Sequence, residues 1–190
     1  MYCTCRNGSE GTALHILFVC TGNICRSPIA ERLAAAHGRR LQIPGFTVSS
    51  AGTRAVIGHE VHREAALVLE QLGGDASGFA ARQLTSRVAS GADLIVTMTK
   101  AHRDGVLELV PNRLHQTFTL SEVSLLVSNC GAETVADLSA MRPELTNSEL
   151  LDIPDPIGQS SEVFAAVGLR IAELLVAVVD LCWRSSPRVE

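Results

Sequence analysis

The sequence has no excess of positive charge, and this absence excludes several classes of partner. Its 16 Lys and Arg residues are outnumbered by 20 Asp and Glu residues, which gives a formal net charge of −4. Nucleic acids and anionic membrane surfaces attract proteins that carry clustered positive charge. We therefore expect no nucleic-acid partner and no membrane partner, and the sequence indicates no particular oligomeric state.

A long hydrophobic run is also missing. The apolar residues 174–179 are bracketed by Glu173 and Asp180, whereas a membrane span needs about 20 predominantly apolar residues. Apolar positions around this stretch recur at spacings of three and four, which predicts a buried helix from about Ser161. Residues 1–12 lack the apolar core of a signal peptide, and their composition predicts a disordered tail.

The cysteines form neither a disulfide framework nor a metal-binding spacing. All six are scattered without a C-x-x-C pair, at Cys3, Cys5, Cys20, Cys25, Cys130 and Cys182. The pair Cys3-x-Cys5 has the composition of a metal site or a redox relay, but a disordered tail fits this segment better. We expect a reduced, cytoplasmic protein that uses no metal and no cofactor.

The chain does contain apolar strands that alternate with helices over one domain, residues 13–190. Strands are predicted at 13–19, 46–50, 93–98 and 117–120, and helices at 27–38, 62–72, 99–110, 121–127 and from 161. This order predicts an α/β fold: a single three-layer domain with a central, mostly parallel four-stranded sheet and helices on both faces. Residues 129–151 lack a clear period and are interpreted as an insertion or a long loop.

The loop Cys20-Thr-Gly-Asn-Ile-Cys-Arg26 lies between the first strand and a helix that opens at Ser27-Pro28. Ligands bind beyond the carboxyl ends of parallel strands, where this loop is expected. Gly22 and Asn23 tolerate positive φ, so that successive backbone N–H groups can turn inward as an anion nest. The helix N-terminus and the planar Arg26 guanidinium favour the same ligand, a phosphate dianion.

Cys20 is the candidate nucleophile of this loop. The positive field around it favours the thiolate, which is the reactive form of cysteine. The Ser27 hydroxyl is placed either to donate to that thiolate or to cap the helix as its N-cap. Cys25 is interpreted either as core packing or as a redox partner that traps oxidised Cys20 as a disulfide. A second Cys-x5-Arg pattern, at Cys182 and Arg188, follows a helix and lacks glycine, so we regard it as chance.

The stretch Phe18 to Pro28 resembles the signature loop of low-molecular-weight protein-tyrosine phosphatases and of the related thioredoxin-coupled arsenate reductases. The resemblance extends over roughly residues 13 to 183. It continues through Ser50-Ala-Gly-Thr53, Ala81-Arg-Gln-Leu-Thr85, Ala92-Asp-Leu-Ile95, Met98, Phe118-Thr-Leu-x-Glu122 and Asp155-Pro156.

This resemblance implies hydrolysis of phosphotyrosine, or of aryl phosphate monoesters, with a phosphotyrosine-containing protein as substrate. Cys20 would attack phosphorus to give a phosphocysteine, Arg26 would hold the equatorial oxygens, and Asp155 would act as general acid and then base. The loop would bind phosphate through Thr21, Gly22, Asn23, Ile24, Cys25 and Arg26. Asn23, Ser27 and Ser50 would support the loop.

Asp155 competes with Asp152 for the role of general acid. Proline on both sides of Asp155 suits a carboxylate that points into a site, although Asp and Pro are also common in turns. The residues alone leave both interpretations open, and the resemblance selects Asp155. Two positions depart from the family pattern: Ile157 replaces a usual aromatic residue, and Phe79 stands where some members carry a supporting His.

Three alternative functions share this scaffold or loop. An arsenate reductase needs further cysteines, but residues 96–105 contain none and Cys130 stands alone. Protein-arginine phosphatases resemble this loop with Thr in place of Ile24, so Ile24 favours tyrosine. A catalytically silent phospho-binding module would not need Asp155 as an acid.

Overall fold

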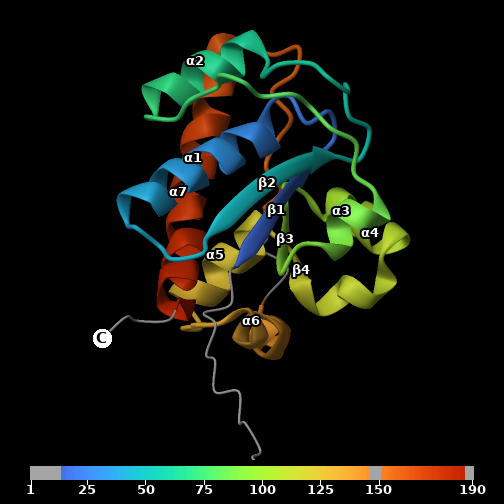
Figure 1. Ribbon diagram of the computed structural model, residues 1–190, viewed down its shortest axis with the longest axis vertical. Helices are drawn as coiled ribbons and strands as arrows, with labels where there is room; N and C mark the ends of the chain where they lie inside the picture. The colour runs from blue at the N-terminus through green and yellow to red at the C-terminus, as the bar shows by residue number, and fades with distance from the viewer. Residues whose placement is uncertain (1–13, 146–150, 187–190) are drawn as a thin grey trace, which may run out of the picture.

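Four parallel strands form the central sheet of the computed structural model, which describes residues 14–145 and 151–186 (Figure 1). They are β1 (His15–Cys20), β2 (Thr47–Gly52), β3 (Leu94–Thr97) and β4 (Thr117–Thr119), in the order β2-β1-β3-β4. In the centre of the sheet, Phe18 of β1 lies opposite Ser50 of β2 and Val96 of β3. The predicted α/β fold with a four-stranded sheet is confirmed, and the sheet is wholly rather than mostly parallel.

Helices cover both faces of the sheet, as predicted (Figure 1). Ile16 and Phe18 of β1 belong to a core built with α1 (Arg26–Arg40), α5 (Leu120–Ser128) and α7 (Ser161–Ser185). Leu17 and Val19 belong to a second core, on the other face, with α3 (Ser86–Ser90) and α4 (Lys100–Leu109). Because successive strand residues point to opposite, covered faces, β1 is an unbroken apolar run.

Helix α1 differs from its predicted bounds at both ends. It begins at Arg26, with Cys25 in the N-cap position and no side-chain cap. The expectation that Ser27 is the N-cap is wrong, because Ser27 lies within the first turn and its hydroxyl contacts Cys20 and Asn23. The helix also continues past Gly38, where a Cβ would overlap the Phe46 ring, so that this glycine permits packing and does not end the helix.

The segment 129–151 contains helix α6 (Val135–Met141), so its interpretation as a long loop is wrong over those residues. Thr134 and Asp137 form a capping box at its start, and Leu138 is fully buried. Arg142, just beyond the helix, stacks its guanidinium 3.8 Å from the centre of the Phe118 ring. The residue after the helix therefore ties this segment to β4, and whether the segment is an insertion stays a prediction.

The remaining elements are α2 (Arg63–Gln71) and two 3-10 helices, Pro111–Gln116 and Arg142–Glu144. The described part of the chain contains no helix that meets the length and apolarity needed to cross a membrane. Both the predicted tail at 1–12 and the Cys3-x-Cys5 pair lie outside the described residues. The domain limits proposed from the sequence also stay predictions.

Candidate active site

The loop from Cys20 to Cys25 is held from outside by the segment that follows β2. The backbone N–H groups of residues 53, 54, 56 and 62 donate to the carbonyl oxygens of residues 20, 21, 22 and 24, at 2.7–3.0 Å. Because these carbonyls point outward, the intervening amides point inward. Within the described residues, the N–H groups of 21–25 have no acceptor. The loop therefore presents the ring of donors that an anion nest requires.

Two residues permit this tight curvature. Asn23 has a φ of 55°, in the left-handed region that Asn tolerates better than most residues. Gly52, the last residue of β2, lies so close to the loop that a Cβ would overlap the Thr21 carbonyl oxygen. Asn23, predicted to support the loop, thus also permits its curvature through its backbone conformation.

The Asn23 side chain organises a hydrogen-bond network beneath the loop. Its Nδ2 donates to Ser27 Oγ at 2.9 Å and to Ser50 Oγ at 2.7 Å, and its Oδ1 accepts from the Arg82 backbone N–H at 2.9 Å. The Ser50 hydroxyl in turn donates a hydrogen bond to Glu31 Oε2 at 2.5 Å. The structure thus brings together the three residues predicted to support the loop and adds Glu31 and Arg82, which the sequence reasoning missed as supports.

Ser27 lies 2.9 Å from the Cys20 sulfur through its Oγ. Since Ser27 Oγ already accepts from Asn23, its own proton is free to donate to the sulfur. A donor of this kind stabilises a thiolate. Of the two roles left open for Ser27 by the sequence, the geometry favours donation to Cys20.

Arg26 is buried and joins the loop to the segment that carries Asp155. Its Nη1 donates to the Ile153 carbonyl at 3.0 Å and its Nη2 donates to Asp155 Oδ2 at 2.5 Å. The arginine side chain is 5% exposed and the aspartate side chain 47% exposed. The carboxylate thus lines the cavity from its open side and contacts the guanidinium.

Asp152 is held elsewhere. Its Oδ1 accepts from the backbone N–H of Lys100 at 2.8 Å, at the first turn of α4. This carboxylate satisfies a free N–H at a helix N-terminus, a structural role. Of the two candidate aspartates, the structure brings only Asp155 to the loop.

The loop opens into a cavity of about 270 Å³. Beyond the loop residues, Arg54, Val56, Asp155 and Ile157 line it. Ile157, the departure from an aromatic residue, is 46% exposed at this rim. The walls therefore combine the aliphatic Val56 and Ile157 with the charged Arg54 and Asp155 above the phosphate loop, which leaves room for an apolar group attached to a phosphate.

Cys25 is in the loop but differs from Cys20 in its surroundings. It is 2% exposed and belongs to the main core. Burial, followed by the negative charges of Cys20 and Asp155, raises the pKa of the Cys25 thiol to about 12. Cys25 is therefore a neutral thiol, which fits core packing directly. Its redox role would depend on the small fraction of Cys25 that is thiolate near neutral pH.

His102 reaches the site without having been predicted from the sequence. Its Nε2 lies 2.8 Å from Thr21 Oγ1 and its Nδ1 lies 2.8 Å from Thr99 Oγ1. Burial, and next the positive charge of Arg26, lower the pKa of His102 to about 4, so the ring is neutral near pH 7. The available signal was topological: Thr99 and His102 follow β3, and β3 ends beside β1.

The other departure, Phe79, is buried and takes no part in the network. The Arg32 guanidinium lies 5.5 Å from the centre of its ring. Support that a histidine would give from this segment comes instead from Arg82, whose backbone binds Asn23 and whose Nε binds the Ser50 carbonyl at 2.7 Å.

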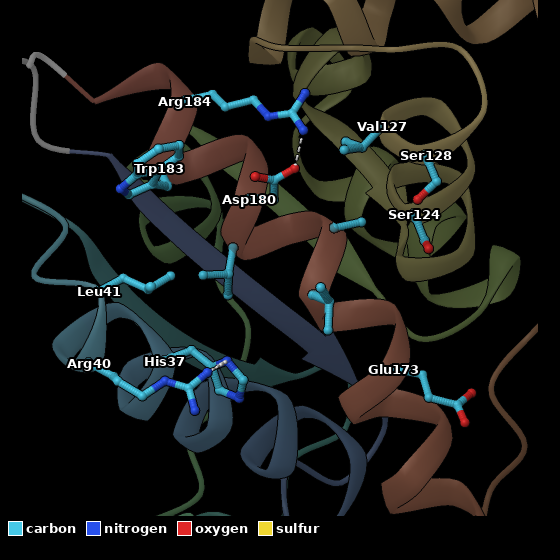
Figure 2. A pocket seen from close by; sticks show the side chains of 13 residues that line it. His37, Arg40, Leu41, Ser124, Val127, Ser128, Glu173, Asp180, Trp183 and Arg184 are labelled. Atoms are coloured by element: carbon cyan, nitrogen blue, oxygen red, sulfur yellow. Dashed lines mark hydrogen bonds and ion pairs between the residues drawn. The ribbon is translucent and has the colours of Figure 1, made fainter.

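A larger cavity, of about 920 Å³, lies between α1, α5 and α7 (Figure 2). Its wall includes Leu41 and the half-exposed Trp183. Asp180 and Arg184 pair across one turn of α7 at 2.5 Å, as the dashed line in Figure 2 marks. It contains none of the predicted site residues. Among the described residues no group of three or more His, Cys, Asp or Glu side chains could hold a metal ion, and the expectation of a metal-free enzyme stays a prediction.

A strand that runs into a Cys-x5-Arg loop, followed by a helix and faced by an aspartate, defines the class of cysteine-dependent phosphatases. The family model described as low molecular weight phosphotyrosine protein phosphatase matches residues 15–131. The protein-tyrosine-phosphatase Etp of Escherichia coli strain K12 is 32% identical over 160 residues, which cover 80% of this chain and 83% of Etp. The chain therefore belongs to the low molecular weight protein-tyrosine phosphatase family, whose members are phosphoric monoester hydrolases.

Solved structures of two kinds resemble the fold. The low molecular weight protein tyrosine phosphatase from T. tengcongensis superposes with a TM-score of 0.71 at 28% identity, over 88% of this chain and 98% of that one. The YwlE arginine phosphatase from Geobacillus stearothermophilus gives 0.69 at 32% identity, over 88% and 91%. The family is thus established, while the relatives act on two different phosphorylated side chains.

Proposed function

We propose that the protein hydrolyses phosphotyrosine in protein substrates through a phosphocysteine intermediate. The observation that carries this proposal is the convergence of Cys20, Arg26 and Asp155 on one cavity lined by inward-facing amides. Cys20 and Arg26 belong to the same loop, whereas Asp155 comes from a segment distant in sequence, so their meeting depends on the fold.

In the first step the Cys20 thiolate attacks phosphorus and the ester oxygen leaves. Arg26 and the loop amides stabilise the charge on the three equatorial oxygens, and Asp155 protonates the departing phenolate. In the second step Asp155, now ionised, accepts a proton from water as that water attacks the phosphocysteine. Phosphate and the Cys20 thiolate are regenerated, with Ser27 donating to the sulfur as it leaves.

Phosphotyrosine is favoured over phosphoarginine by the apolar walls of the cavity. Ile24, Val56 and Ile157 line it and can bury a phenyl ring, and Ile24 has no hydroxyl that could accept from a guanidinium. The resemblance to the YwlE arginine phosphatase supports phosphoarginine as the second candidate. An Ile24→Thr variant should shift the ratio of the two activities toward phosphoarginine.

Three further assignments belong to this proposal. The catalytic domain covers residues 13–190 with an insertion at 129–151, which the end of the family match at residue 131 supports. A cytoplasmic location follows from the need to keep Cys20 reduced. An arsenate reductase would need a relay thiol, and the buried Cys182, whose pKa burial raises to about 12, is a poor candidate.

The proposal is tested by hydrolysis of para-nitrophenyl phosphate and of matched phosphotyrosine and phosphoarginine peptides, with and without a chelator. Cys20→Ser should abolish turnover and Arg26→Ala should lower kcat/KM by at least about 100-fold. Cys130→Ser, which removes a thiol outside the site, is the matched control and should behave as wild type. Turnover by purified Cys20→Ser protein would refute the mechanism.

A further inference from the structure

His102 bridges two hydroxyl groups that lie on different elements. Thr21 directly follows the nucleophile Cys20, and Thr99 is the N-cap residue of α4. The His102 side chain is 7% exposed, and each ring nitrogen lies 2.8 Å from one threonine oxygen. A single imidazole thus ties the second residue of the phosphate loop to the helix that follows β3.

The directions of these two hydrogen bonds are linked, because a neutral imidazole carries a proton on only one of its two nitrogens. Thr99 Oγ1 accepts from the backbone N–H of His102 at 3.1 Å, which leaves its own proton and one further lone pair for His102 Nδ1. We assign the tautomer in which Thr99 donates and Nδ1 accepts. A neutral imidazole that accepts at Nδ1 carries its proton at Nε2, and Nε2–H then donates to Thr21 Oγ1.

We infer that His102 is a positioning residue, which orients the Thr21 hydroxyl so that its proton points into the phosphate cavity. Thr21 lines that cavity beside Cys20 and Arg26. With one lone pair of Thr21 Oγ1 engaged by His102, its hydroxyl proton is the remaining donor. The loop gains a side-chain donor to the phosphate dianion in addition to its amides. This inference rests on the proposed function, because it assigns a ligand to the same loop.

The same turn of α4 also anchors the segment that carries the general acid. Lys100 N–H donates to Asp152, and Ile153 N–H donates to the Met98 carbonyl at 2.9 Å. A large substitution at His102 would therefore disturb Asp155 as well as Thr21. The test needs variants that separate loss of the donor from loss of the helix turn.

The first pair of variants separates the Thr21 hydroxyl from the shape of the side chain. Thr21→Val keeps the branched shape, whereas Thr21→Ser keeps the hydroxyl. Affinity for inorganic phosphate is measured by calorimetry, which needs no turnover. A hydrogen bond to a charged group is worth about 1.5–3 kcal/mol, so Thr21→Val should bind phosphate roughly 10- to 100-fold more weakly. Thr21→Ser should bind phosphate and unfold as wild type, whereas Thr21→Val also leaves His102 Nε2–H without its acceptor and should unfold at a lower temperature.

The second pair uses the two positions of the ring nitrogens. The amide nitrogen of Gln can reach the place of Nε2, whereas that of Asn reaches only the place of Nδ1 and pairs with Thr99. His102→Gln should retain phosphate affinity and KM, and His102→Asn should weaken both as Thr21→Val does. The double variant Thr21→Val/His102→Asn should lose nothing further, since both changes remove one interaction.

Equal phosphate affinity for His102→Gln and His102→Asn would overturn the inference, and so would wild-type affinity for Thr21→Val or additive losses in the double variant. If wild type is active and both Thr21 variants bind phosphate with wild-type affinity, the inference is wrong and the proposed function still stands. Wild-type protein that neither binds phosphate nor hydrolyses the ester would reject the proposed function and this inference with it.

Discussion

Asp152 and Asp155 are near neighbours in sequence with different partners in the fold. Asp155 contacts the Arg26 guanidinium, and its Oδ1 also accepts from the Ile157 backbone N–H at 3.2 Å. Asp152 binds the N-terminal turn of α4. The Ile157 N–H holds one oxygen of Asp155 and the Arg26 guanidinium holds the other, which places the carboxylate beside the phosphate loop, where the proposed proton transfer would take place.

This difference predicts opposite kinetic behaviour for two matched variants. Asp155→Asn should slow esters with poor leaving groups by about 10²- to 10⁴-fold and good ones much less, because protonation matters only for a basic leaving oxyanion. Asp152→Asn should change neither, since an amide oxygen still accepts from Lys100. A rate series over aryl phosphates of graded leaving-group pKa makes the comparison. Parallel slopes for the two variants would contradict the assignment of Asp155.

Cys25 carries a redox prediction that the structure makes more specific. Peroxide oxidises the Cys20 thiolate to a sulfenic acid, and the Cys25 thiolate then attacks that sulfur, forming a disulfide and expelling hydroxide, which takes a proton to become water. Because the pKa of Cys25 is raised to about 12, the rate of this second step should rise about tenfold per pH unit near neutrality. Oxidation removes the Cys20 charge that contributes to the shift, so trapping should be faster than the reduced protein implies.

Peptide mapping after mild peroxide at several pH values checks this prediction. We expect a Cys20–Cys25 link and full recovery with thiol in wild type, and incomplete recovery in Cys25→Ala. A pH-independent rate, or equal recovery of the two proteins, would leave Cys25 with core packing alone.

The residues of the site differ in how much of their position and role could be predicted from the sequence. The segment from Cys20 to Arg26 is contiguous, so its chemistry can be inferred from one stretch of sequence. Asp155 could be separated from Asp152 only by a family resemblance, since flanking prolines also fit a turn. His102 required the strand order, because only adjacent parallel strands bring the ends of β1 and β3 to one place.

At the scale of elements, α6 is the part of the fold that local chemistry defines most clearly. It has seven residues, too few to show a helical period, but Thr134 and Asp137 cap it reciprocally. Thr134 Oγ1 accepts from the Asp137 N–H at 3.2 Å, and Asp137 Oδ2 accepts from the Thr134 N–H at 2.8 Å. The capping signal was present in the sequence, whereas β1 and α7 were found because they are long and strongly patterned.

Removing that cap should cost stability without affecting catalysis. Thr134→Ala should lower the free energy of unfolding by about 1 kcal/mol, while kcat and KM stay at wild-type values because α6 does not line the site. Thr119→Ala, in the buried capping box of α5, should cost more, since it leaves the buried backbone N–H of Glu122 without its acceptor. Chemical denaturation of both variants gives the comparison, and an equal or larger loss for Thr134→Ala would contradict it.

For the whole molecule, His102 makes stability depend on pH. Its pKa is about 4 in the folded state, lowered by burial and Arg26 against the opposing charges of Asp155 and Asp152, compared with 6.5 for a free imidazole. Below pH 6.5 the unfolded chain gains a proton that the folded protein does not, so stability falls as pH drops from 6.5 to about 4. The loss is roughly 3 kcal/mol at most.

This prediction is checked by measuring the free energy of unfolding of wild type and of His102→Gln between pH 7.5 and 4. That range includes the pKa of His102 in the unfolded chain and in the folded protein. Wild type should lose more stability than the variant over that interval. The lowered pKa of His37, caused by burial and by Arg40, acts in the same direction in both proteins and cancels in the difference. Parallel curves would show that His102 does not titrate as described.

The position of the single tryptophan has a practical consequence for spectroscopy. The chain has one Trp and one Tyr, and Trp183 lies near the end of α7 beside the large cavity (Figure 2), away from the phosphate loop. Tryptophan fluorescence, excited at a wavelength that tyrosine does not absorb, therefore reports on the end of α7 alone. It should follow unfolding and solutes that enter that cavity, and it should stay silent when phosphate binds, so occupancy of the loop has to be followed by calorimetry or phosphorus resonance.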